Sequence, residues 1–277
     1  MSHYIHGTDP GEQRRLALLN DVLNARCLAE VAPRPGDRVL DVGSGLGQFT
    51  HALAAAVAPA SAGRVVGIER SPAQLAHARA ITPALAEFRE GSAFALPLSE
   101  VEWGSFDLVH ARFLLEHLPK PVDAVRQMVR AAKPNGDGRI VLLDDDHPVL
   151  SLSPEPPGFP ALWQAYMRAF DRLGNDPLTG RRLVSLLHQA GACPRRATMI
   201  SWANCAGNPE FPILIRNLID VIRTARPQVI EFALLEADAF DLALDEIHRW
   251  SITRPDAVIW YAVSFAEAAT AGPPPQP

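Results

Sequence analysis

Short apolar runs recur along the chain, and segments with an apolar residue at every third or fourth position separate them. This alternation predicts strands of a parallel sheet connected by helices. The predicted strands cover residues 39–42, 64–70, 85–90, 106–111, 139–144, 197–203 and 257–265. The predicted helices begin at residues 12 and 72 and cover residues 48–57, 122–132, 161–173, 182–190, 211–226 and 229–250. The Pro-rich stretch 148–160 predicts an irregular connection.

The stretch from Val39 to Val57 is the one around which the chain is organised. A short buried strand runs directly into Gly43, Gly45 and Gly47, and a helix follows. A strand, a glycine turn and a helix form the ligand-binding corner of a doubly wound sheet. Asp41 precedes the glycines, and its carboxylate would repel a pyrophosphate but suit a ligand with a sulfonium and an amino group. The candidate ligand contacts here are Asp41, Gly43, Ser44, Gly45 and Gly47.

Three motifs carry a resemblance to a known family. Asp-x-Gly-x-Gly-x-Gly at 41–47 resembles motif I of the class I S-adenosylmethionine (SAM)-dependent methyltransferases. Phe-Asp-Leu-Val at 106–109, with Leu-Glu-His-Leu-Pro at 115–119, resembles motif IV of their small-molecule, type 11/25-like bacterial members. Lys-Pro-x-Gly-x-Gly-x-Ile-Val-Leu at 133–142 also resembles this group. The Asn/Asp-Pro-Pro-Tyr/Phe form of amino-directed nucleic-acid enzymes is absent from motif IV, which argues against a nucleic-acid substrate.

The resemblance implies an α/β fold, a doubly wound Rossmann-like seven-stranded mixed sheet. The implied strand order is 3-2-1-4-5-7-6, with the last two strands antiparallel to the others. We expect one SAM-dependent methyltransferase domain over residues 1–277. Residues 1–35 would form an N-terminal lid helix, and residues 148–178 and 204–252 would form helical cap segments over the cofactor.

The resemblance also implies where SAM contacts the chain. Glu69 ends the second strand, where an acid can accept hydrogen bonds from both ribose hydroxyls of an adenosine cofactor, SAM or NAD alike. Ser92 stands where the family commonly has an acid that contacts the adenine amino group. Arg112 could pair with the cofactor carboxylate or with a substrate anion, and Arg15 is a lid candidate. The remaining implied contacts are Tyr4, Arg70, Gln74, Ala93, Phe94 and Ala111.

Methyl transfer from SAM needs positioning and desolvation more than a dense set of catalytic groups. The acceptor is expected to be an O, N or C nucleophile of a small metabolite. His110, His117 and His147 are the candidate general bases, although a structural histidine bonded to backbone is an alternative for His117. Alternation of side chains keeps the acids at 144–146 and His147 from converging. We therefore expect one or two of these four to line the substrate pocket and no metal site.

Composition narrows the remaining choices. The net charge is −5 without a basic run, which argues against a nucleic-acid surface. The three cysteines are too few and too scattered for a disulfide framework. No apolar run is long enough to span a membrane, so we expect a cytoplasmic monomer or homodimer. Two alternatives stay open. A non-catalytic SAM-binding protein is one, and an NAD-dependent oxidoreductase, which the G-x-G-x-G spacing and Asp41 oppose, is the other.

Overall fold

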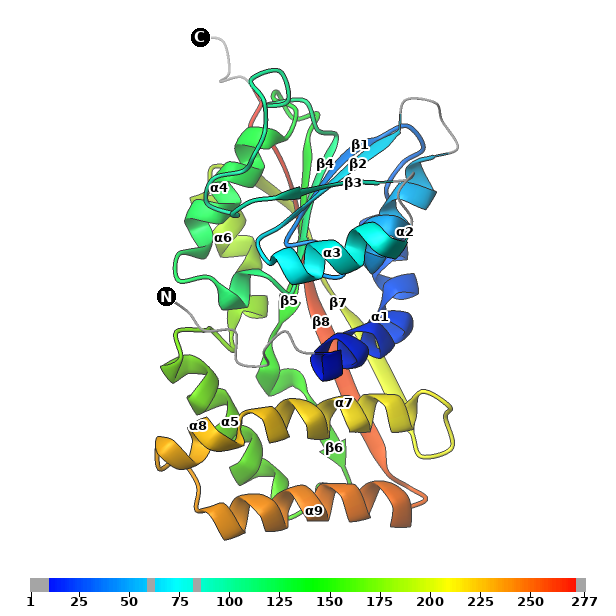
Figure 1. The fold of residues 1–277 in the computed structure, drawn as a ribbon, viewed down its shortest axis with the longest axis vertical. Helices are drawn as coiled ribbons and strands as arrows, with labels where there is room; N and C mark the ends of the chain where they lie inside the picture. The colour runs from blue at the N-terminus through cyan, green and yellow to red at the C-terminus, as the bar shows by residue number, and fades with distance from the viewer. Residues whose placement is uncertain (1–9, 59–62, 82–85, 273–277) are drawn as a thin grey trace.

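The computed structural model describes residues 10–58, 63–81 and 86–272. A mixed sheet runs through the molecule, with strands β1 (Arg38–Val42), β2 (Arg64–Glu69), β3 (Ala86–Glu90), β4 (Leu108–Arg112), β5 (Arg139–Asp145), β6 (Ser151–Ser153), β7 (Cys193–Cys205) and β8 (Val258–Ala269). Strands β1 to β5 are parallel, and β8 is antiparallel to β5, β6 and β7. Figure 1 shows the sheet edge-on.

The strand order confirms the predicted topology and adds one strand to it. The order is β3-β2-β1-β4-β5-β8, and β7 pairs with the other edge of β8. Counted along the seven predicted strands, this is 3-2-1-4-5-7-6. The extra strand β6 pairs with the start of β8 inside the stretch predicted as an irregular connection, so that prediction was wrong at Ser151–Ser153.

Helices cover both faces of the sheet because each presents one apolar face to it. They are α1 (Pro10–Val31), α2 (Gln48–Val57), α3 (Pro72–Ile81), α4 (Pro121–Ala131), α5 (Phe159–Arg172), α6 (Leu183–Gln189), α7 (Phe211–Thr224), α8 (Arg226–Glu231) and α9 (Ala237–Thr253). Residues of α1 and α2 share one apolar core, and residues of α4 and α6 share a second. No helix within the described ranges is long and apolar enough to cross a membrane.

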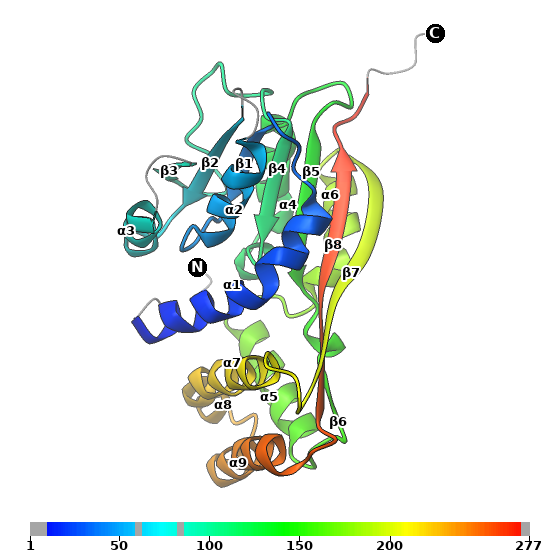
Figure 2. The same ribbon diagram turned by 90° about the vertical axis from the view of Figure 1, so that its right-hand side faces the viewer.

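Helices α5, α7, α8 and α9 form a separate group, here called the helical layer. It lies beyond the carboxyl ends of β4 and β5, and the long strands β7 and β8 reach from the main sheet to it (Figures 1 and 2). Helix α1 extends across the space between sheet and layer (Figure 2) and contacts both α2 and α7. The space between the parallel strand ends and the helical layer is therefore closed on several sides.

One predicted helix was wrong. Residues 229–250 were expected to form a single helix, but α8 ends at Glu231 and α9 begins at Ala237. Ala233 takes a left-handed φ of 50°, and its N–H and that of Leu234 bond back to carbonyls of α8. The apolar residues of this stretch gave no signal for a break. The chain turns here because Val229 and Phe240 are both buried in the same core.

Candidate functional site

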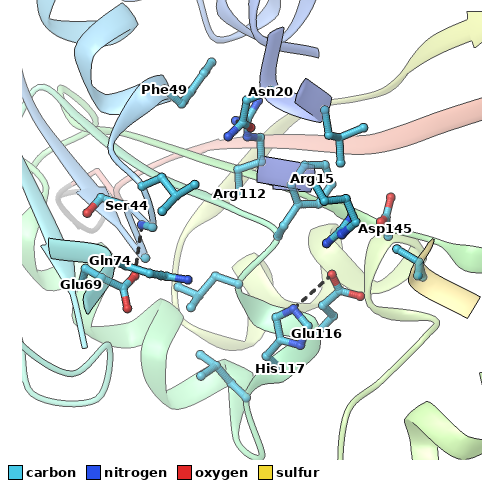
Figure 3. A pocket seen from close by; sticks show the side chains of 18 of the residues that line it. Arg15, Asn20, Ser44, Phe49, Glu69, Gln74, Arg112, Glu116, His117 and Asp145 are labelled. Atoms are coloured by element: carbon cyan, nitrogen blue, oxygen red, sulfur yellow. Dashed lines mark hydrogen bonds and ion pairs between the residues drawn. The ribbon is translucent and has the colours of Figure 1, made fainter. Parts of the chain in front are cut away.

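A cavity of about 480 Å³ opens at the carboxyl ends of the parallel strands, within the range of small-molecule sites. Its two ends have different chemistry (Figure 3). The glycine-loop end is formed by Asp41, Gly43, Ser44, Gly45, Glu69 and Gln74. The acid–aromatic end is formed by Glu116, His117, Asp145, His147, Trp163, Tyr166 and Phe170. One continuous cavity joins the two ends.

The three glycines of the loop have positive φ values but different tasks. Gly43 and Gly45 line the cavity, with φ of 77° and 53°. Gly47 has a φ of 79°, yet it does not line the cavity. A Cβ at Gly47 would lie 2.7 Å from the Cβ of Ala78 and 2.9 Å from Cζ of Phe88. This glycine lets α2 begin close against α3 and β3, and a cofactor contact at Gly47 stays a prediction.

Asp41 fixes the floor of the glycine-loop end. Its Oδ2 accepts a hydrogen bond from Thr50 Oγ1 at 2.6 Å, and its Oδ1 lies 2.7 Å from His110 Nδ1. His110 is fully buried and packs against the Phe49 ring. These contacts fix Asp41 against Thr50 of α2 and His110 of β4 and so stabilise the base of the glycine loop. His110 thus lies at the opposite end of the cavity from His117 and His147.

Glu69 is placed as the sequence predicts, on the cavity wall at the end of β2. Its Oε2 accepts a hydrogen bond from Gly45 N at 3.1 Å, and its Oε1 accepts one from Ser71 N at 2.8 Å. These bonds hold the carboxylate against the loop, and each oxygen keeps a second lone pair for a ligand. Predicted residues that also line this wall are Arg70, Gln74, Ser92, Ala93 and Phe94.

Arg112 lies between the two ends and ties β4 to α1. Its Nη2 donates to the side-chain oxygens of Asn20 and Asn24, at 2.8 and 2.9 Å. Its guanidinium carbon sits 4.2 Å from the centre of the Phe49 ring. Its Nη1 is buried and has no hydrogen-bond partner among the described residues. A buried donor without a partner is rare in proteins, which makes Arg112 a candidate for contact with a ligand anion.

The structure also places Ala111 and Arg15 relative to the cavity. The Ala111 side chain is buried in the core that holds α4 and does not line the cavity, so a contact of its backbone with the cofactor stays a prediction. Successive side chains of β4 point to opposite faces, which places His110 and Arg112 on the cavity and Ala111 away from it. Arg15 of α1 lines the cavity and donates from Nη1 to Asn217 Oδ1 of α7. Tyr4 lies outside the described residues.

Glu116 is the centre of the acid–aromatic end. The single turn Leu115–His117 follows β4, and Asp144 Oδ2 accepts its first N–H groups, from Leu115 at 2.8 Å and Glu116 at 3.3 Å. This capping holds Glu116 between two histidines. Its Oε2 lies 3.0 Å from His147 Nε2, and its Oε1 lies 3.6 Å from His117 Nε2. Figure 3 shows the Glu116–His117 pair facing the cavity.

Neighbouring strand β5 supplies the other acids. Asp145 Oδ1 accepts a hydrogen bond from the Tyr261 hydroxyl at 2.8 Å. Asp146 is held by the guanidinium of Arg181 through three contacts of 2.8 to 3.0 Å. One or two of residues 144–147 were expected at the pocket, but Asp145, Asp146 and His147 all line it. A chain bend after β5 removes the strict alternation on which the expectation rested.

Burial controls the charge of this cluster. Desolvation raises the pKa of Glu116 well above its usual value, and it does the same for Asp144. Desolvation also raises the pKa of Asp145. It lowers the pKa of His147 and brings that of His117 down to about 4. The Glu116–histidine group therefore favours the neutral forms of all three side chains.

An aromatic wall faces this cluster from α5. Trp163, Tyr166 and Phe170 are all buried, and the ring centres of all three lie 5.0 to 5.6 Å from that of His147. The sequence predicted the helix but not this role. The spacing of the three rings, on one face of the helix, was the available signal, and core packing accounts for the same spacing equally well.

Two functional residues were missed by sequence reasoning. Glu116 was visible in the Leu-Glu-His-Leu motif but was not singled out, because a motif does not show that the acid is buried. Asp145 was considered only as part of an acidic run. With His147, they place ligand atoms within 4.8 Å of one another, as a metal site would, where no metal site was expected.

Comparisons with known proteins agree with this geometry. Residues 33–155 match the family model described as a methyltransferase domain. A demethylmenaquinone methyltransferase from Lactococcus lactis is 31% identical over 137 residues, covering 48% of this chain and 52% of the relative. The chain spans about half the length of the curated relatives it matches.

Solved structures share the fold. A protein from Bacillus halodurans C-125 has a TM-score of 0.57 at 17% identity, covering 90% of this chain and 98% of the other. A SAM-dependent methyltransferase from Aquifex aeolicus has a TM-score of 0.51 at 18% identity, covering 69% of this chain and 93% of the other. The domain match covers residues 33–155, and the strand order and the loop after β1 agree with a Rossmann-like methyltransferase fold.

Proposed function

We propose that this protein transfers a methyl group from SAM to a small-molecule acceptor. The observation that carries the proposal is the continuous cavity, which joins the glycine loop after β1 to a buried polar cluster. SAM would lie along the glycine-loop end, and the acceptor would lie at the acid–aromatic end. The helical layer and α1 would act as the cap and the lid of this cavity.

The residues present fit SAM. Gly43 and Gly45 leave the backbone open beside the cavity, and the Glu69 carboxylate is positioned for ribose hydroxyls. The Ser44 hydroxyl and Arg112 Nη1 are buried polar groups without partners among the described residues. Arg112 Nη1 would pair with the carboxylate of the amino-acid portion. We infer from these groups that the glycine-loop end is incomplete without a polar ligand.

Bound SAM supplies a methyl carbon that its sulfonium has already activated. The chain contributes position and exclusion of water. Glu69 and the loop hold the nucleoside, Arg112 holds the amino-acid portion, and the aromatic wall keeps bulk water from the acceptor. The Glu116–His147 pair can take a proton from an acceptor that carries one. His110 is not assigned this role, because Asp41 engages its ring at the opposite end of the cavity.

Calorimetric titration of the full chain with S-adenosylhomocysteine (SAH) and, separately, with NADH tests the cofactor assignment. We expect saturable one-to-one binding of SAH and none of NADH. The reverse result would contradict the proposal and favour an oxidoreductase. Binding of SAH without any SAH production from SAM, in the presence of a broad set of small acceptors, would favour a non-catalytic SAM-binding protein.

A further inference from the structure

The acid–aromatic end combines two features that the proposed transfer does not by itself require. Glu116 and Asp145 lie on the cavity wall, and Asp144 is buried directly behind Glu116. The rings of Trp163, Tyr166 and Phe170 line the same end. Carboxylates next to aromatic faces form the environment in which proteins hold organic cations.

Among the described residues, Glu116 contacts His147 and His117, and burial lowers the pKa of both, so neither supplies a full positive charge near neutral pH. Arg181 is engaged by Asp146. Arg15 acts on Asp145 and also donates to Asn217. Burial is the main cause that raises the pKa of Glu116, and the acids Asp145 and Asp176 raise it further, while a hydrogen bond with Asp144 offsets part of the rise. A cation at this place would restore the ionised form of Glu116, and it would gain an ion pair in a poorly hydrated site.

An independent feature also indicates a ligand here. His147 lines the cavity and is 8% exposed, and its Nδ1 has no hydrogen-bond partner among the described residues. A buried polar atom in this state is rare unless a ligand or water completes it. A bare divalent ion would use Glu116, Asp145 and His147, but the rings of Trp163 and Phe170 offer it no ligand atom. The wall therefore favours an organic cation over a metal ion.

We propose that the methyl acceptor is an organic amine, bound as its ammonium ion between Glu116 and Asp145 and against the aromatic wall. This inference rests on the proposed function. The ammonium N–H groups would be donors to the two carboxylates. After one proton passes to the Glu116–His147 pair, the nitrogen lone pair forms the bond to the methyl carbon. The carbon–sulfur bond breaks with its electron pair on sulfur, and the product is a methylated ammonium and neutral SAH.

The test compares three probes of similar shape and different charge: benzylamine, benzyl alcohol and benzoate. Each is titrated by calorimetry into the full chain saturated with SAH and, in parallel, into the chain alone. We expect benzylamine to bind at least about tenfold more tightly than benzyl alcohol, the order of one ion pair in a partly buried site, and benzoate to bind most weakly.

Two variants assign the preference to the site. Glu116→Gln removes the charge with little change of shape and should reduce the advantage of benzylamine to within about threefold of benzyl alcohol. Asp171→Asn is the matched control, since Asp171 is an exposed acid of α5 outside this cavity. It should leave the order and the affinities unchanged.

Several results would overturn the inference. Among them are equal binding of amine and alcohol, tightest binding of benzoate, or no binding of any probe. One-to-one binding of Mn²⁺ that Glu116→Gln abolishes would show a metal site in place of an amine site. Absence of SAH binding would instead contradict the proposed function, and the titrations without SAH would still report the charge preference of the cavity.

Discussion

The two ends of the cavity differ in how their polar groups are satisfied. At the glycine-loop end, backbone N–H groups donate hydrogen bonds to the carboxylate of Glu69, and the hydroxyl of Thr50 donates one to the carboxylate of Asp41. At the acid–aromatic end, acids and histidines face one another in a buried space, and their pKa values move towards neutral forms. The comparison indicates that the first end is built by the backbone for one type of ligand. The second end is built by side chains, and the charge of these side chains depends on the ligand that binds there.

The largest effect is expected from a change at the glycine-loop end. Gly47→Ala should lower the free energy of unfolding by about 3 kcal/mol, because an alanine there combines a left-handed φ with overlap against Ala78 and Phe88. Gly191→Ala is the control, since Gly191 has a φ of 87° and open space around it. It should cost only about 1 kcal/mol. Equal losses in denaturant unfolding would show that φ alone matters.

The next effect concerns the ligand at the same end. Glu69→Gln should weaken SAH binding by about 10- to 100-fold, the range for a hydrogen bond to a charged group. Glu90→Gln changes an exposed acid on the neighbouring strand and should leave binding unchanged. Calorimetry measures both. An unchanged Kd in the Glu69 variant would remove the ribose assignment and weaken the contrast between the two ends.

A smaller effect of opposite sign is expected at the acid–aromatic end. Since burial raises the pKa of Glu116, the ligand-free protein loses stability as the pH rises from about 4.5 through the folded-state pKa. Glu116→Gln removes this loss. The variant should gain about 1 kcal/mol at pH 8, a rise in Tm of about 2–4 °C, and less at pH 5. A variant less stable than the parent at pH 8 would contradict this prediction and show that the contacts of Glu116 with His147 and His117 outweigh the cost of its burial.

The smallest effect is expected at the ion pair between Arg181 and Asp146, because this pair is partly exposed, as ordinary surface ion pairs are. The Arg181 side chain pairs with Asp146 and is about half exposed to solvent. Arg181→Lys should therefore cost less than about 1 kcal/mol. Arg182→Lys, at a similarly exposed pair with Asp176, should cost no more than that. A loss from Arg181→Lys well above that of its control would place Asp146 among the groups that organise the cluster.

The same contrast explains how much could be predicted from sequence. The strand order was predicted from the family resemblance, whereas α2 and the placement of Glu69 followed from local patterns, because a glycine turn and strand-end acids act through nearby backbone. The roles of Gly47 and Ala111 needed the packing of α3 and α4. Glu116, Asp145 and the rings of α5 come from segments far apart in sequence, and only their burial against one another gives them a shared function. No local pattern shows that burial.

The most direct test of the central claim is a structure of the full chain with SAH bound. The account predicts the ribose hydroxyls within about 3 Å of the Glu69 carboxylate and the sulfur facing Glu116 and His147. SAH bound away from Glu69, or with its sulfur directed away from the acid–aromatic end, would contradict a single cavity in which one end holds the methyl donor and the other holds the acceptor.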